Sequence, residues 1–104
     1  MTIILNAHLI DNVINASWQI AAEHYLYKDS IRVSINNEAI AHEFILLDES
    51  VINDEFFGES LVLQNTLVVR AVYNSTNLQN AIITIEYQGC AAGKYCYPKQ
   101  QQNI

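Results

Sequence analysis

Two cysteines, Cys90 and Cys96, are the residues of this sequence whose type and spacing could do chemistry. The segment from Ala91 to Tyr95 separates them and has Gly93 at its centre. Glycine adopts positive φ angles at little steric cost, so the chain can reverse there and bring the two sulfurs within disulfide distance. The spacing therefore predicts a hairpin closed by a disulfide.

Two kinds of disulfide fit this spacing. A passive staple would gain little, because the chain-entropy account gives about 2.4 kcal/mol for so short a loop, less than for longer loops. A redox-active pair needs a reachable thiolate, which a nearby cation favours, and Lys94 lies within the loop. Spacing alone leaves both interpretations open.

Bound cofactors are not expected. Zinc would need further ligands, and His8, His24 and His42 are scattered without the spacing of a metal site. The sequence also has no glycine-rich phosphate loop, so neither a nucleotide nor a flavin is expected.

A second unusual segment joins two acids to two aromatic residues: Asp54, Glu55, Phe56 and Phe57, followed by Gly58. One phenylalanine ring could simply complete the core. The alternative is a lid in which an aromatic ring covers the disulfide while the acids handle protons as thiols form. The sequence does not choose between these interpretations.

Tyrosines also accompany the cysteines. Tyr25 and Tyr27 fall on one face of an expected strand, and Tyr95 and Tyr97 flank Cys96. Such stripes are usual in cores and on sheet surfaces. The hydroxyls of Tyr25 and Tyr27 could also reach an acid or a sulfur if they lie at the site.

The elements that must position these residues are strands, since apolar side chains recur with period two. This alternation covers Ile14–Ile20, Ile31–Ile35, Leu67–Tyr73 and Ile83–Tyr87. Turn residues separate these runs, at Asp11-Asn12, Lys28–Ser30, Asn36-Asn37, Asn53-Asp54, Gly58 and Asn74–Asn77. The pattern predicts an all-β, antiparallel, immunoglobulin-like sandwich.

Two further segments need interpretation. Ala21, Ala22 and Glu23 favour a helix, but the tyrosines that follow favour a strand, so we expect a turn and then a strand. The tail Lys99–Ile104 is polar and is expected to fray.

Composition bounds the possible functions. The 104 residues fit one domain, and 51% hydrophobic with 15% charged residues indicate a folded chain. The net charge of −6 and the scattered basic residues argue against nucleic-acid binding. No apolar run approaches the ~20 residues that span a bilayer, and the first residues do not resemble a secretory signal. Localisation is therefore argued from the cysteines.

Three segments together resemble one family, the N-terminal periplasmic domain of the bacterial thiol:disulfide interchange protein DsbD. Residues 86–98, EYQGCAAGKYCYP, are similar to its active-site hairpin. Residues 53–60, NDEFFGES, resemble its cap loop, and residues 18–33, WQIAAEHYLYKDSIRV, resemble its strand pair with a Tyr-Leu-Tyr motif. Order and spacing agree over nearly the whole chain, 1–104, taken as a single domain.

The resemblance implies a protein-disulfide reductase domain in the periplasm. Its electron donor would be the thioredoxin-like C-terminal domain of a DsbD-type membrane protein. Its acceptors would be periplasmic thioredoxin-fold proteins, such as a disulfide isomerase or a cytochrome c maturation thioredoxin. Direct membrane insertion of this domain is not expected.

The resemblance also implies roles for single residues. Cys96 would form mixed disulfides and Cys90 would resolve them. Phe56 would be the shielding residue of a cap loop that continues through Phe57 and Gly58. Asp54 and Glu55 would be the acids near the thiols, and Tyr25 with Tyr27 would supply the supporting hydroxyls. The alternative from a different class is an immunoglobulin-like binding module with a purely structural disulfide.

Overall fold

A computed structural model describes residues 3–54, 58–73 and 81–104. Strands make up most of this part of the chain, and its one short helical turn is η1 (Lys28–Ser30). The strands are β1 (Ile3–Ile10), β2 (Val13–Ile20), β3 (His24–Tyr27), β4 (Arg32–Ile35), β5 (Glu38–Ile40), β6 (Glu43–Asp54), β7 (Gly58–Val72), β8 (Ile83–Tyr87), β9 (Gly89–Ala91), β10 (Tyr95–Cys96) and β11 (Gln100–Asn103). The described residues contain no helix long and apolar enough to cross a membrane.

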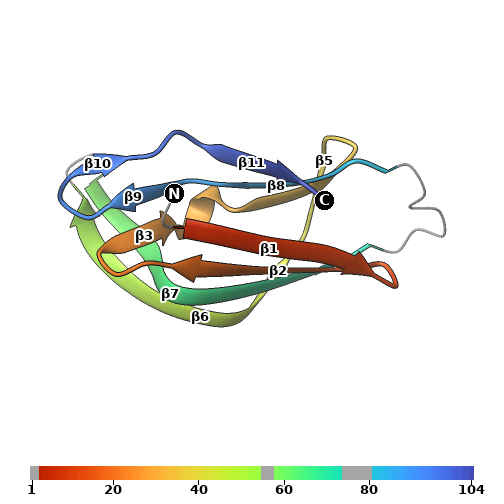
Figure 1. Cartoon of the computed structure of the whole chain (residues 1–104), viewed down its shortest axis with the longest axis horizontal. Coiled ribbons are helices and arrows are strands. Elements are labelled where there is room, and N and C mark those ends of the chain that lie inside the picture. The colour runs from red at the N-terminus through yellow and green to blue at the C-terminus, as the bar shows by residue number, and fades with distance from the viewer. Residues whose placement is uncertain (1–2, 55–57, 74–80) are drawn as a thin grey trace.

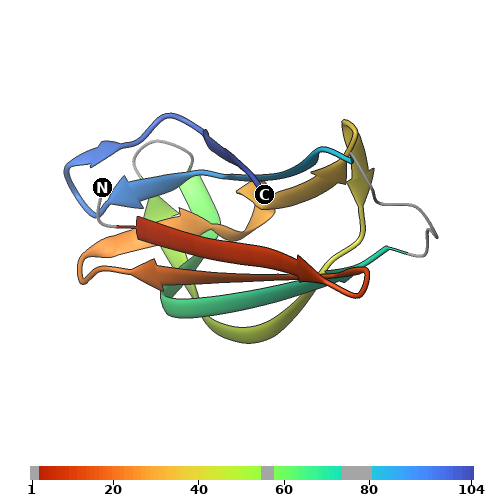
Figure 2. The ribbon, with the colours of Figure 1, turned by 45° about the vertical axis from the view of Figure 1, so that its right-hand side comes forward.

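The strands form two antiparallel sheets (Figure 1). The larger sheet has the order β1-β2-β7-β3-β9-β10, and β6 pairs with β7 outside this path. The smaller sheet has the order β11-β8-β4-β5 and forms the second layer, which a rotated view also shows (Figure 2). The expected all-β, immunoglobulin-like sandwich is confirmed.

Two tight hairpins confirm the turns predicted at Asp11-Asn12 and Asn36-Asn37, whereas the turn predicted at Asn74–Asn77 lies outside the described residues. Asp11 and Asn12, between β1 and β2, have φ angles of 50° and 64°. Asn36 and Asn37, between β4 and β5, have φ angles of 51° and 68°. Two consecutive positive φ angles define the turn that best matches the twist of a hairpin, and Asn and Asp tolerate them better than other side chains.

The main core lies between the sheets and follows the predicted alternation. Ile14, Ala16, Trp18 and Ile20 of β2 are all buried. The Trp18 ring meets the Tyr87 ring of the smaller sheet edge-on, at a centroid distance of 5.8 Å. This contact joins the two layers.

Two predictions about chain ends and turns are wrong. Asn53 and Asp54 do not form a turn but belong to β6, where Asp54 pairs with Gly58, because the ladder with β7 outweighs the turn preference of Asn and Asp. The tail does not fray: Gln100–Asn103 pair with β8 as strand β11. Polar side chains are compatible with this strand because the backbone makes the pairing, and Lys99 adds a contact with Glu86 at 3.6 Å.

The register of β11 predicts the effect of two proline substitutions. The Ile104 N–H donates to the Ile83 carbonyl, so by antiparallel alternation the Gln102 N–H points toward β8 and the Gln101 N–H points away. We expect Gln102→Pro to lower the free energy of unfolding by about 1–2 kcal/mol, because it removes a ladder hydrogen bond. Gln101→Pro is the matched control and should cost much less. Equal losses in urea denaturation would show that β11 is not held by this register.

Candidate functional site: a disulfide-closed hairpin

The two cysteines pair with each other across the hairpin β9–β10. This hairpin lies at one end of the sandwich (Figure 1). They form a disulfide with an S–S distance of 2.00 Å and a Cα–Cα distance of 3.9 Å. Gly93 has φ +72° and lies in the reversal between them, as the sequence predicts. Gln88, which lies between β8 and β9, interrupts the strand that leads into the hairpin.

Backbone pairing sets which cysteine is offered to solvent. The Tyr97 N–H donates to the Gly89 carbonyl at 2.9 Å, so Cys90 and Cys96 form a pair without mutual backbone hydrogen bonds. Consequently the Cys96 N–H and C=O point away from β9. They face the open edge of the sheet, because β10 is the last of its described strands on that side. Cys96 therefore lies on an edge strand with its backbone directed outward.

The two sulfur-bearing residues differ in exposure. Cys90 is 0% exposed, whereas Cys96 is partly exposed. Cys90 also pairs with Tyr25 on its other side, so it is enclosed between two strands. An incoming reagent would meet Cys96 first.

Tyr25 and Tyr27 lie against the disulfide, on the same face of the sheet. The Tyr27 hydroxyl is 3.1 Å from the Cys90 sulfur and 3.5 Å from the Cys96 sulfur. Since a disulfide sulfur carries no proton, the hydroxyl is the donor. The Tyr25 ring packs edge-on against the Tyr27 ring, at a centroid distance of 5.5 Å. The structure thus brings together four of the predicted site residues.

A small second core surrounds these residues on the face opposite the main core. Val62 of β7 is fully buried with Tyr25, Tyr27 and Cys90, and Ile52 of β6 packs against them together with Cys96. Because Ile52 is two residues before Asp54, the end of the β6–β7 pair lies next to the disulfide.

The predicted cap loop is described only in part. The Asp54 backbone pairs with Gly58, which has φ +76° and begins β7. Glu55, Phe56 and Phe57 lie outside the described residues, and of Asp54 only the backbone is described.

Tyr95 and Tyr97 point to the other face of the hairpin, together with His24. The His24 Nε2 is 3.2 Å from the Tyr97 hydroxyl, and the Tyr95 and Tyr97 hydroxyls are 3.4 Å apart. This contact raises the pKa of Tyr95, first through the hydrogen bond with Tyr97 and then through charge repulsion. These rings therefore support the hairpin from the face opposite the one that carries the sulfurs.

Other candidate groups are not assembled at the disulfide. Lys94 is exposed, and within the described residues its ammonium makes no hydrogen bond to either sulfur. His8 lies on β1, and His42 lies just before β6. Partial burial lowers the pKa of His42. Across 3–54, 58–73 and 81–104 no three potential metal ligands gather in one place.

An immunoglobulin-like β-sandwich with a disulfide-closed hairpin at one end is the class of protein that this fold and site define. Residues 4–104 match the family "Thiol:disulfide interchange protein DsbD, N-terminal", and the chain belongs to this family.

Two curated relatives named thiol:disulfide interchange protein DsbD are more than 30% identical to this chain. DsbD of Actinobacillus pleuropneumoniae is 38% identical over 94 residues, 90% of this chain. DsbD of Shigella boydii is 34% identical over 92 residues, 88% of this chain. In both cases the matched part is 16% of the relative's length, so the chain corresponds to a small part of those proteins.

Solved structures share the fold. The reduced form of the DsbD N-terminal domain of Neisseria meningitidis superposes with a TM-score of 0.83 at 24% identity, over 99% of this chain and 82% of that one. A complex between the DsbD and PilB N-terminal domains from the same organism gives a TM-score of 0.69 at 22% identity, over 98% of this chain and 81% of that one.

Sequence reasoning missed several residues of the site. Val62 and Ile52 pack around the disulfide, and Ser30 and Gln88 hold the strand that carries Tyr27. The predicted period-two stretch begins at Leu67 and does not reach Val62, which the structure places on the same strand, β7. Nothing in the local sequence distinguishes Ser30 from other turn serines, since its partner Gln88 is 58 residues away in the chain.

Proposed function

We propose that this domain carries out thiol–disulfide exchange through Cys90 and Cys96. It would pass electrons from a thioredoxin-like domain of a DsbD-type membrane reductase to periplasmic thioredoxin-fold proteins. The observation that carries the proposal is the asymmetry of the disulfide, with Cys96 partly exposed on an edge strand and Cys90 buried behind it. A bridge built only to staple a loop has no need of this asymmetry.

The exchange proceeds in two displacements. The Cys96 thiolate of the reduced domain attacks one sulfur of a partner disulfide, which breaks that bond and releases a partner thiolate. The Cys90 thiolate then attacks the Cys96 sulfur and releases the second partner thiolate. Two electrons reach the partner, its two sulfurs take up protons, and the domain is left with the Cys90–Cys96 bridge. The reverse sequence, with a reduced donor, restores the two thiols.

The groups around the sulfurs suit these steps. A hydroxyl that donates to a sulfur stabilises the thiolate more than the thiol, and the Tyr27 hydroxyl is within reach of both sulfurs. Tyr25 supports the Tyr27 ring by edge-on packing. Asp54 and Glu55 would exchange protons with the thiols, by the resemblance to the family.

The proposed cap comprises Phe56, Phe57 and Gly58. Its support in the described residues is the position of Ile52 and Gly58, which bring the end of the β6–β7 pair to the disulfide. The cap would shield the Cys96 sulfur from small reagents and move aside when a partner docks.

A thioredoxin-fold partner is supported by one structural neighbour, a complex of a DsbD N-terminal domain with a PilB N-terminal domain. The outward-facing backbone of Cys96 offers an edge to which an extended partner segment can pair. Periplasmic localisation is part of the same proposal, because the periplasm is an oxidising compartment in which disulfides form and persist.

The reduction potential separates this function from a binding module with a structural disulfide. Structural bridges usually lie below about −300 mV, and exchange-competent bridges lie higher. We expect the Cys90–Cys96 couple to lie above that value in glutathione or dithiothreitol buffers, with thiol content measured by alkylation and mass spectrometry. The Cys90→Ser, Cys96→Ser double variant has no thiol and gives the background of the alkylation measurement. A bridge that stays oxidised well below −300 mV would favour the binding module.

A further inference from the structure

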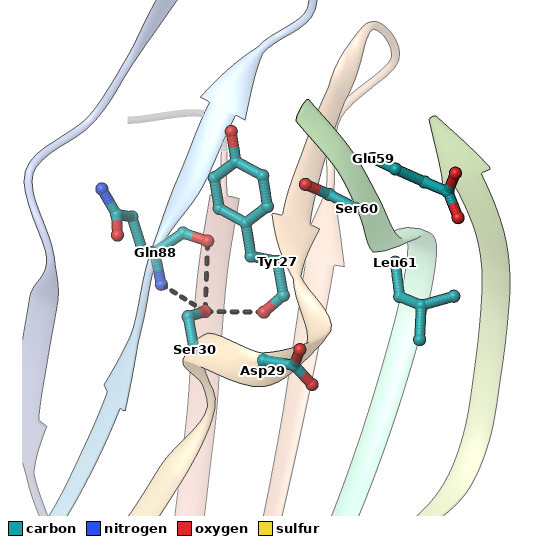
Figure 3. Close-up of a pocket in the computed structure, with 7 residues that line it drawn as sticks. All are labelled: Tyr27, Asp29, Ser30, Glu59, Ser60, Leu61 and Gln88. Carbon is teal, nitrogen blue, oxygen red and sulfur yellow. Dashed lines mark hydrogen bonds between the residues drawn. The ribbon is translucent and has the colours of Figure 1, made fainter. Parts of the chain in front are cut away.

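Ser30 holds the strand that carries Tyr27 through its side-chain hydroxyl. It is the last residue of η1, which follows β3 directly. Its Oγ lies 2.6 Å from the Tyr27 carbonyl oxygen and 2.9 Å from the Gln88 backbone nitrogen (Figure 3). The hydroxyl therefore donates to Tyr27 and accepts from Gln88; the Gln88 carbonyl, at 3.3 Å, is a second acceptor.

These contacts close a ring of three hydrogen bonds. The Tyr27 N–H donates to the Gln88 carbonyl at 3.0 Å, the Gln88 N–H donates to Ser30, and Ser30 donates to the Tyr27 carbonyl. Both backbone groups of Tyr27 are thus held to Gln88, one directly and one through the serine. In a regular ladder the Gln88 N–H would donate directly to the Tyr27 carbonyl. Here the Ser30 hydroxyl lies between these two groups and bonds to both.

The ring of hydrogen bonds lies between the two segments whose separation matters to the disulfide. On one side is Tyr27, whose hydroxyl approaches both sulfurs. On the other side is Gln88, two residues before Cys90. Tyr27, Ser30 and Gln88 also border a pocket of about 470 Å³, so the ring of hydrogen bonds lies in the wall of this pocket (Figure 3).

We propose that Ser30 is a positioning residue for thiol–disulfide exchange, which sets the approach of the Tyr27 hydroxyl to the Cys90 and Cys96 sulfurs. This inference rests on the proposed exchange function. Ser30 does not touch the sulfurs itself. Its effect on the thiols must pass through Tyr27, and this condition makes the proposal testable.

The test is a double-mutant cycle on the reduced domain. The variants are Ser30→Ala, Tyr27→Phe and their combination, and the readout is the pH profile of iodoacetamide alkylation, with mass spectrometry assigning the labelled cysteine. Tyr27→Phe should slow alkylation at neutral pH about two- to tenfold and move the profile to higher pH, the effect of one lost hydrogen bond to the thiolate. Ser30→Ala should give a smaller change in the same direction, about twofold.

In the Tyr27→Phe background, Ser30→Ala should leave the alkylation profile unchanged, although it still lowers the melting temperature. Ser30→Thr, which keeps the hydroxyl, should restore the wild-type profile. Ser34→Ala is the matched control, because Ser34 is a buried serine that donates to the Thr84 carbonyl, and both residues lie in the smaller sheet, which does not carry the disulfide. It should change stability and leave alkylation unaffected. If reduced Ser30→Ala does not fold, Ser30→Thr and Ser30→Val give the same comparison.

Two results would overturn the proposal: an unchanged profile in folded Ser30→Ala, or an equal shift with and without the Tyr27 hydroxyl. Alkylation involves no partner protein. A failure here is therefore distinguishable from a failure of the exchange function, which trapping of partner proteins tests separately.

Discussion

The Cys90→Ser variant should accumulate a covalent complex with a thioredoxin-fold partner, and the Cys96→Ser variant should form none. The difference is all or none because the two cysteines have different access. Cys96 is partly exposed and can reach a partner disulfide, whereas Cys90 is 0% exposed behind it. Without Cys90 the mixed disulfide cannot be resolved from within the domain.

The measurement is non-reducing electrophoresis of a periplasmic extract mixed with each reduced variant, followed by mass spectrometry of the captured bands. Captured proteins should carry a disulfide to Cys96 and have a thioredoxin fold. The double variant without either cysteine controls for non-covalent capture. Equal trapping by both single variants would contradict the assignment of roles, and no trapping by either would contradict the exchange function.

The strands that carry the core were predictable because their side chains face two different environments. In β2, Trp18 and Ile20 are buried while Gln19 between them is exposed, so the period of two is visible in the sequence. In β11 the exposure of the side chains also alternates, but all four residues are polar, so the sequence shows no period of two. Its pairing depends on the partner strand β8, and the sequence pattern gave the opposite prediction.

The site shows a similar division. The cysteines, their hairpin and the Tyr25–Tyr27 pair could be predicted because spacing and resemblance to a family both point to them. The hydrogen bonds of Ser30 with Gln88 could not be predicted, because they depend on where β3 ends and on the interruption between β8 and β9. Both features are set by tertiary packing.

Gly89 connects the fold to the site, and the largest stability loss is expected there. A Cβ atom at this position would lie 2.7 Å from the Tyr25 carbonyl oxygen and 2.6 Å from the Ile3 Cδ1 atom. The Ile3 side chain can move, but the carbonyl belongs to the neighbouring strand β3. Gly89→Ala must therefore push β3 and β9 apart, the two strands that bring Tyr25 and Cys90 together.

We expect Gly89→Ala to destabilise the oxidised domain by about 3 kcal/mol, at the upper end of the usual overpacking cost, because backbone has to shift. For a domain of this size the melting temperature should fall by roughly 10–20 °C. Gly93→Ala is the matched control within the same hairpin: its φ of +72° is strained for alanine, but no atom lies within 4 Å of the new Cβ. Its cost should be about 1–2 kcal/mol.

Thermal and urea denaturation of the two variants measure this difference in stability. A Gly89→Ala protein as stable as Gly93→Ala would mean that β3 and β9 are not packed this closely. In that case the backbone around Gln88 and Gly89 would not hold the Tyr27 hydroxyl against the sulfurs.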